Sequence, residues 1–179
     1  MGNAKYSRLL EIGTGSGIFL PELSKHCSNL YACDIHDNYG HIAELLRHYK
    51  IKNCEAGRQN IEATDYPDNS FDAIVAVSVL EFVADIKKAL REINRILKPD
   101  GIFITICPME SKLLDAVLSL YAKKNPDEDF GDARKFTSKL LEENFKVLSK
   151  GYMLPLIGKW FPVYTHYKLG KNSASELKL

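Results

Sequence analysis

Two acidic residues and a group of glycines are the residues of this sequence best placed to hold a ligand. The stretch LLEIGTGSG places Glu11 directly before a turn with three glycines, Gly13, Gly15 and Gly17. Asp34 follows the next apolar run, YAC. Glycines allow positive φ and let a ligand approach the backbone closely, and a carboxylate at the end of the second strand can accept hydrogen bonds from ribose hydroxyls. Together these features predict a turn that binds a nucleoside.

The spacing of the glycines bears on which nucleoside is bound. The dinucleotide fingerprint G-x-G-x-x-G would require a glycine at position 18, where this chain has Ile18. The bulky Ile18 disfavours close seating of a pyrophosphate, and Glu11 would repel a diphosphate but attract an ammonium group. The pattern therefore favours a nucleoside ligand with an amino group. An NAD-dependent oxidoreductase is the alternative that this spacing disfavours.

The elements that position these residues are read from apolar periodicity. Short apolar runs alternate with segments of helical period, which is typical of a parallel sheet covered on both faces. The expected strands are residues 7–12, 29–34, 52–57, 71–79, 102–107, 145–152 and 162–168. The expected helices are residues 17–27, 39–50, 85–97, 111–123 and 133–143. Both acids then fall at the carboxyl ends of strands, where ligands bind in such sheets.

The composition is that of an ordinary globular chain. Its 179 residues are 45% hydrophobic and 26% charged, with a formal net charge of +1. We expect a single domain over residues 1–179, no integral membrane segment and no signal peptide. The four cysteines form no CxxC pair and predict neither a metal site nor a disulfide framework, which fits a cytoplasmic protein. No basic stripe with interleaved aromatic residues indicates a nucleic-acid partner.

Several motifs, in order along the chain, resemble those of a known family. They are LLEIGTGSG, YACD, NIEATDYPDNSFDAIVAVSVLEFV and ALREINRILKPDGIFITICP, which together cover residues 7–108. In this order they resemble the class I S-adenosylmethionine-dependent methyltransferases, in particular the small-molecule, type 11-like group. The resemblance implies an α/β fold with a doubly wound, Rossmann-like sheet of seven strands, mostly parallel, with an antiparallel C-terminal strand. It also implies a cofactor-binding core at residues 7–108, followed at 109–179 by acceptor-side helices and a C-terminal hairpin.

The resemblance also implies roles for individual residues toward S-adenosylmethionine. The implied cofactor-binding residues are Glu11, Gly13, Thr14, Gly15, Gly17, Asp34, Ile35, Asn60, Ile61, Val77 and Ser78. The glycine turn and Glu11 would surround the aminocarboxypropyl tail, and Asp34 would take the ribose hydroxyls. Asn60 stands where the family often has an aspartate that contacts the adenine amino group; its side-chain carbonyl can still accept that hydrogen bond. Val77 and Ser78 would line the methyl-transfer side.

The methyl acceptor is less constrained by the sequence. The fourth strand ends in VSVLE rather than in the Asn-Pro-Pro-Tyr/Phe loop associated with DNA and glutamine-amide methylation, so a small molecule is favoured. Candidate bases or positioning residues are His36, His41, Glu81, Tyr121 and His166. None of them is assigned as catalytic. A non-catalytic subunit that binds the cofactor or activates a partner is the alternative of a different class.

Two C-terminal segments suggest further roles. Residues 111–130 could form a lid over the acceptor, because such insertions often follow the fifth strand in this family. The apolar loop at residues 153–164 could contact a lipid acceptor, a membrane surface or a second subunit, although packing of this loop into the core is favoured.

Overall fold

The computed structural model describes residues 6–37, 39–108, 133–152 and 164–173. Its strands are β1 (Tyr6–Ile12), β2 (Cys27–Asp34), β3 (Cys54–Arg58), β4 (Phe71–Val77), β5 (Leu97–Pro108), β6 (Lys146–Tyr152) and β7 (Tyr164–Gly170). Its helices are α1 (Leu20–Leu23), α2 (Tyr39–His48), α3 (Ile86–Ile96) and α6 (Ala133–Asn144), with 3₁₀ turns η1 (Ser24–His26) and η2 (Leu80–Phe82). The expectations for residues 111–130 and most of 153–164 lie outside the described residues.

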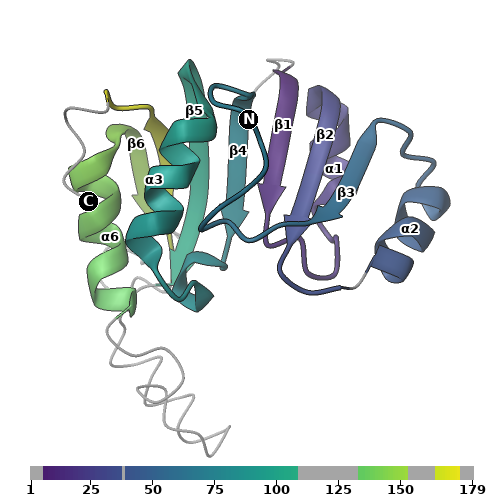
Figure 1. Ribbon diagram of the computed structural model, residues 1–179, viewed down its shortest axis with the longest axis horizontal. Helices are drawn as coiled ribbons and strands as arrows, with labels where there is room; N and C mark the ends of the chain where they lie inside the picture. Colours follow the sequence, from purple (N-terminus) through teal and green to yellow (C-terminus); the bar gives the residue numbers. More distant parts are fainter. Residues whose placement is uncertain (1–5, 38, 109–132, 153–163, 174–179) are drawn as a thin grey trace, which may run out of the picture.

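The seven strands form one sheet in the order β3-β2-β1-β4-β5-β7-β6 (Figure 1). Strands β1 to β5 run parallel to one another. Strand β7 is antiparallel to both of its neighbours, β5 and β6. This confirms the expected seven-stranded, mostly parallel sheet with an antiparallel C-terminal strand. The order reverses direction between β1 and β4, and ligands bind at such a switch point in open α/β sheets.

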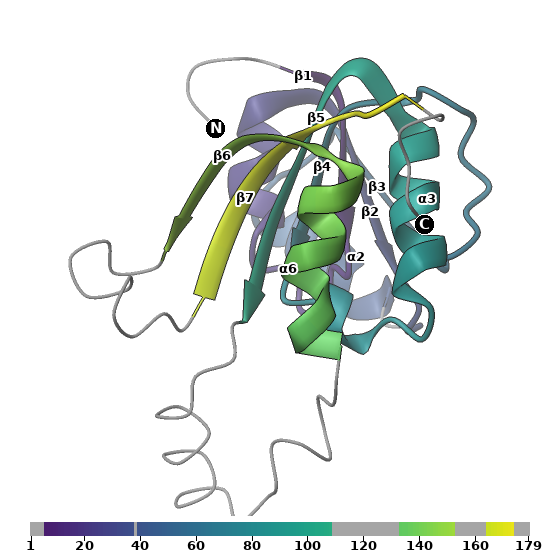
Figure 2. The same ribbon diagram turned by 90° about the vertical axis from the view of Figure 1, so that its left-hand side faces the viewer.

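Helices cover both faces of the sheet. In Figures 1 and 2, α3 and α6 lie together on one face. There they bury residues such as Leu90, Ile93 and Phe145 against Leu10 and Phe103 of the strands. A second core on the opposite face joins α1 and α2 to β1, β2 and β4. Its main members are Leu9, Leu20, Leu23, Leu30, Ile42 and Val75.

Several element boundaries differ from the expected ones, and three of these differences have a local cause. The helix expected at 17–27 is only the four-residue α1 followed by η1, because the glycine turn extends to Gly17, whose carbonyl accepts the Leu20 N–H. β4 stops at Val77 rather than at residue 79, because Ser78 adopts a φ of +49° that no strand accommodates. β5 begins at Leu97, directly after α3, so the expected turn KPDG forms an irregularity within the β4–β5 pairing.

Candidate cofactor site

A cavity of about 380 Å³ opens at the carboxyl ends of the four neighbouring strands β3, β2, β1 and β4. Each strand end contributes a short run of lining residues. The lining comprises Ile12, Gly13, Cys33, Asp34, Ile35, His36, Gln59, Asn60, Ile61, Glu62, Ser78, Val79, Phe82, Val83 and Ala84. Six of the residues implied by the resemblance are therefore brought together: Gly13, Asp34, Ile35, Asn60, Ile61 and Ser78.

The glycine turn is tied to the end of β2 by hydrogen bonds. The backbone N–H of Gly13 donates to the Cys33 carbonyl at 2.8 Å, and Thr14 donates to the same oxygen from its N–H at 3.2 Å and its hydroxyl at 3.3 Å. Gly17 closes the turn by donating its N–H to the Thr14 carbonyl at 2.8 Å. Thr14 and Gly15 line a smaller neighbouring cavity with Asp34 and His36.

Positive φ angles explain why this turn contains glycines. Gly13, Gly15 and Gly17 have φ of +70°, +52° and +75°, which side chains rarely adopt. At Gly13 a Cβ would also lie 2.3 Å from Cγ2 of Val79, and at Gly17 it would lie 2.8 Å from Cδ1 of Ile42. Gly15 has open space around it. Gly13 thus lets Val79 close the floor of the cavity, whereas Gly17 lets α2 pack against the turn.

Asp34 joins the glycine turn to the cavity. Its Oδ2 accepts the Gly15 N–H at 2.8 Å, and its Oδ1 accepts the His36 N–H at 2.9 Å. The two backbone donors fix the carboxylate at the end of β2. A ligand with vicinal hydroxyls could donate to both oxygens at once.

Glu11 lies beneath the turn and is almost fully enclosed. Its side chain is 2% exposed, and its Oε2 has no hydrogen-bond partner among the described residues. Burial, followed by the charge of Asp34, raises the pKa of Glu11 to about 8. Glu11, Gly17 and Val77 line neither of the two cavities described above, so their implied roles toward the cofactor stay predictions.

The segment after β3 supplies the side of the cavity opposite the glycine turn. Asn60 Oδ1 accepts the Glu62 N–H at 3.0 Å, so the side-chain amide stabilises the turn at residues 60–62 and also lines the cavity. Ile61 is buried in the core, and Ile35 across the cavity is 52% exposed. The Glu62 carboxylate accepts the Asp85 N–H at 3.0 Å, which connects this turn to the start of α3.

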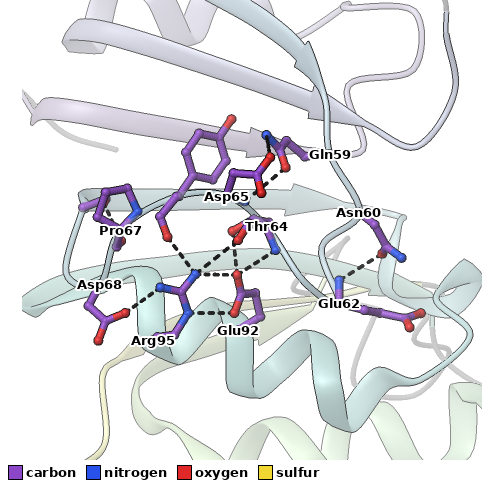
Figure 3. A network of polar contacts seen from close by, with 11 residues as sticks. Gln59, Asn60, Glu62, Thr64, Asp65, Pro67, Asp68, Glu92 and Arg95 are labelled. Carbon is purple, nitrogen blue, oxygen red and sulfur yellow. Dashed lines mark hydrogen bonds and ion pairs between the residues drawn. The ribbon is translucent and has the colours of Figure 1, made fainter.

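An arginine-centred network holds the continuation of this segment against α3 (Figure 3). Arg95 donates to Glu92 Oε1 at 2.6 Å, to the Tyr66 carbonyl at 2.7 Å and to Asp68 Oδ1 at 2.5 Å. Glu92 Oε1 also accepts the Thr64 N–H at 2.8 Å and its hydroxyl at 2.6 Å. Burial alone would raise the pKa of Glu92, but the hydrogen bonds from Arg95 and Thr64 outweigh it and lower this pKa. The network fixes the loop that carries Asn60 and Ile61.

The turn after β4 supplies residues that the sequence analysis missed. Ser78 donates its N–H to the Ile106 carbonyl at 2.9 Å while holding a positive φ, which a non-glycine residue adopts at a cost of about 1–3 kcal/mol. Val79, Phe82 and Val83 follow and line the cavity; Phe82 is 66% exposed. The signal for them was the apolar run VSVLEFV, of which only residues up to 79 are assigned to the expected fourth strand.

The candidate bases are dispersed. Of those that the structure describes, only His36 lines the cavity. Glu81 lies outside the cavity lining and close enough to Cys107 that its charge adds to burial in raising the pKa of that thiol. His166 lies on β7 opposite Ile106, with its ring over Gly151. His41 is exposed on α2, and Tyr121 lies outside the described residues.

The described helices include none that is both long and apolar enough to cross a membrane.

Comparison with known proteins defines the family. A family described as "Methyltransferase domain" matches residues 10–105. An uncharacterized methyltransferase of Bacillus subtilis, YcgJ, is 29% identical over 100 residues, and the match covers 55% of this chain and 40% of that protein. The ubiquinone/menaquinone biosynthesis C-methyltransferase UbiE of Pasteurella multocida is 30% identical over 125 residues, with 67% and 46% covered. The chain thus spans less than half the length of these two relatives.

The fold agrees with this match. The crystal structure of a SAM-dependent methyltransferase from Aquifex aeolicus superposes with a TM-score of 0.71 at 21% identity, and covers 94% of this chain and 84% of that one. The sheet order, with a cavity at its switch point, is that of a Rossmann-like protein. Within that class, the chain belongs to the class I S-adenosylmethionine-dependent methyltransferase family.

Proposed function

We propose that this chain binds S-adenosylmethionine and transfers its methyl group to a small-molecule acceptor. The observation that carries the proposal is Asp34, a carboxylate fixed by two backbone N–H groups at the end of β2 and lining the cavity. A carboxylate in this place suits the two ribose hydroxyls of an adenosyl group. Membership of the methyltransferase family supports the same cofactor.

The residues present fit the rest of the cofactor. The buried, unpartnered Oε2 of Glu11 suits the ammonium of the amino-acid tail, and Gly15 has no side chain packed on its backbone. Ile35, Ile61 and Val83 suit the faces of a purine, and Asn60 offers an amide to its edge. A cavity of about 380 Å³ falls within the range of small-molecule sites.

When bound, S-adenosylmethionine supplies a methyl group on a positively charged sulfonium. The task of the chain is to align the acceptor with that methyl group and to exclude water. In this proposal Asp34 binds the ribose hydroxyls. Val79 packs against Gly13 and forms an apolar wall of the cavity. Among the candidate bases that the structure describes, His36 is the one that lines the cavity, so an acceptor proton would be taken by His36 or by water.

The acceptor that fits best is a small apolar molecule. Phe82 lines the cavity, and 66% of its surface is exposed. Ala84 continues the apolar wall. The naming of one relative as a quinone-biosynthesis C-methyltransferase supports an apolar, carbon-methylated acceptor for this chain.

The cofactor assignment is tested by measuring S-adenosylhomocysteine binding with isothermal titration calorimetry. Asp34→Ala should weaken binding at least tenfold, about 1.4 kcal/mol, because the ribose hydroxyls lose their acceptor. Asp37→Ala is the matched control, since Asp37 is an exposed aspartate three residues later that lines neither cavity. Equal affinities of wild type and Asp34→Ala would contradict the assignment.

Catalysis is tested separately by measuring S-adenosylhomocysteine formation with panels of phenolic or quinol acceptors and of amines. Turnover with the apolar panel alone would support the proposed acceptor, and turnover with amines alone would overturn it. Cofactor binding without turnover until a second protein is added would favour the alternative of a partner-activating subunit.

A further inference from the structure

The helices on one face of the sheet stop short of its last three strands. On that face α1 and α2 pack over β1, β2 and β4. In Figure 2, α3 and α6 lie on one side of β5, β7 and β6, and no described helix lies on the other side of these three strands. Parallel sheets usually have helices on both faces. The side of β5, β7 and β6 that points away from α3 and α6, the open face, therefore lacks such a cover among the described residues.

The floor of the open face is apolar. On β5 it consists of Ile102, Ile104 and Ile106, which are only partly buried. Ile102 and Ile104 pack against the second core, on the side of α1 and α2. Leu148 of β6 extends the floor, because a Cβ on Gly170 of β7 would lie 3.7 Å from both of its methyl carbons. Leu148 is 47% exposed, so water reaches a large part of this apolar surface.

The charged groups of the open face are all basic. The strand register places Lys168 and His166 of β7 beside the isoleucines, and it places Lys146 of β6 beside Gly170. All three side chains are exposed, and none forms an ion pair or a hydrogen bond with a described residue. The described strands contribute no acid to this face. The open face thus combines an apolar floor with basic groups that lack a described counter-charge.

The width and length of the open face match a single helix. Neighbouring strands lie about 4.8 Å apart, so β5 and β6 are roughly 10 Å apart across β7. An α-helix with its side chains has a diameter of about 10 Å. Along β5, Ile102 and Ile106 are separated by about 13 Å, which is roughly the length of nine helical residues. A helix of about two to three turns would therefore cover the isoleucines.

The basic groups decide what kind of helix fits. A helix with an apolar stripe and acidic flanks would cover the isoleucines and pair with Lys146 and Lys168 at the same time. A second copy of this chain, docked face to face, would instead bring these lysines together, which is unfavourable. The floor has neither aromatic rings nor arginines, which are the side chains that suit single-stranded nucleic acid.

We propose that the open face is a docking site for an amphipathic, acidic helix of a partner protein. The leucine-like stripe of that helix would pack on the isoleucines and Leu148, and its acids would pair with Lys146 and Lys168. The proposal does not depend on the proposed function, because no residue of the open face lines either cavity.

The test uses two fluorescein-labelled peptides of about 18 residues, long enough to form isolated helices. One has leucines along one side and glutamates along the other, and the second has lysine in place of each glutamate. Fluorescence anisotropy should show that the acidic peptide binds at least tenfold more tightly than the basic one. The chain has a formal net charge of only +1, so its overall charge does not account for such a preference. A scrambled acidic peptide without the leucine stripe should not bind.

A charge reversal tests the role of the lysines. Lys146→Glu combined with Lys168→Glu should make the basic peptide the tighter ligand. Lys52→Glu combined with Lys87→Glu is the matched control, because both lysines are exposed and lie outside the open face. This control changes the net charge by the same amount and should keep the preference of the wild type. Reversal in both double variants would mean that the peptides respond to overall charge, and it would overturn the proposal.

Two neighbouring residues of β6 test which face is used. Leu148→Glu should weaken binding of the acidic peptide at least tenfold, because it places an acid in the apolar floor. Val147→Glu is the control: Val147 is 41% exposed, but it pairs with Leu169, which belongs to the core beneath α3 and α6. It should bind the peptide as wild type does. Thermal unfolding checks that both variants are folded, which their exposed positions favour.

Other occupants of the open face would give different results. Size-exclusion chromatography with light scattering should show a monomer, and a dimer that Leu148→Glu dissociates would assign the face to a second copy. Co-sedimentation with phosphatidylglycerol vesicles that is lost in Leu148→Glu would assign it to a lipid surface. Either result, equal loss of peptide binding in Leu148→Glu and Val147→Glu, or absence of binding by the acidic peptide would overturn the proposal.

Discussion

Glu11 shows how a single side chain can make the stability of a fold depend on pH. Its pKa is raised to about 8 in the folded chain, above the ordinary value of 4.5. Between these two values the folded state holds a proton that the unfolded state has released. Its contribution to stability is therefore fully present below about pH 4.5 and is lost as the pH rises through 8, with a slope of about 1.4 kcal/mol per pH unit.

We expect Glu11→Gln to be more stable than wild type in the ligand-free state, and increasingly so from pH 5 to pH 8. The reason is that glutamine bears no charge that must be buried as the pH rises. Urea denaturation at pH 5.5 and pH 8 measures the difference. Glu44→Gln is the control, because Glu44 is an exposed glutamate on α2. A Glu11→Gln variant with the same pH dependence as wild type would show that Glu11 is ionised in the empty site.

At the scale of elements, the turn between β1 and α1 depends on two different uses of glycine. Gly13 and Gly15 both need positive φ, but a Cβ meets Val79 only at Gly13. The turn therefore combines a backbone requirement with a packing requirement. The second comes from Val79 in the turn after β4, more than sixty residues further along the chain.

This distinction predicts different costs for two alanine substitutions. Gly15→Ala should lower the free energy of unfolding by about 1–2 kcal/mol through backbone strain alone. Gly13→Ala should cost more, and Gly13→Ala with Val79→Ala should recover the part that arises from the clash. Chemical denaturation of the three variants provides the measurement. Equal costs at Gly13 and Gly15 would mean that Val79 moves aside freely.

The loop after β3 is held by α3 rather than by its own strand. Arg95 and Glu92 of α3 contact Thr64, Tyr66 and Asp68, as Figure 3 shows. Because these contacts join a helix to a loop about thirty residues earlier, the loop and α3 should lose order together.

Arg95→Met tests this coupling while keeping the apolar stem of the side chain. We expect it to lower the free energy of unfolding by about 1–3 kcal/mol, because Glu92 and the Tyr66 carbonyl lose their donor. Binding of S-adenosylhomocysteine should also weaken, since the loop carries Asn60 and Ile61. Arg91→Met, an exposed arginine on the same helix, should change neither quantity. Weakened stability with unchanged binding would separate the network from the site.

At the scale of the whole molecule, a ligand that binds only the folded chain stabilises all of it. S-adenosylhomocysteine at 100 times its dissociation constant should raise the free energy of unfolding by about 2.7 kcal/mol. NAD at the same concentration should leave it unchanged, because Ile18 interrupts the dinucleotide spacing. Thermal unfolding with each ligand measures both effects. Stabilisation by NAD and not by S-adenosylhomocysteine would favour the oxidoreductase alternative.

The sequence by itself determined the sheet, the glycine turn and the acid at the end of β2. These depend on local patterns: apolar runs form buried strands, and glycine spacing forms a turn wherever it occurs. The family motifs added the cofactor, and six of the eleven implied residues line the cavity. The late start of α1 at Leu20 was missed, because the glycine turn continues to Gly17, a residue that the apolar periodicity assigned to the helix.

Only the tertiary structure decided the features that depend on residues distant in sequence. In the tertiary structure Val79 packs against Gly13, and Arg95 donates a hydrogen bond to the loop after β3. Oε2 of Glu11 has no hydrogen-bond partner among the described residues. The tertiary structure also placed Glu81 outside the cavity lining, although this residue directly follows the β4 turn. The physical reason is that burial and electrostatic interaction depend on what lies nearby in space, whereas strand and turn propensities depend on what lies nearby along the chain.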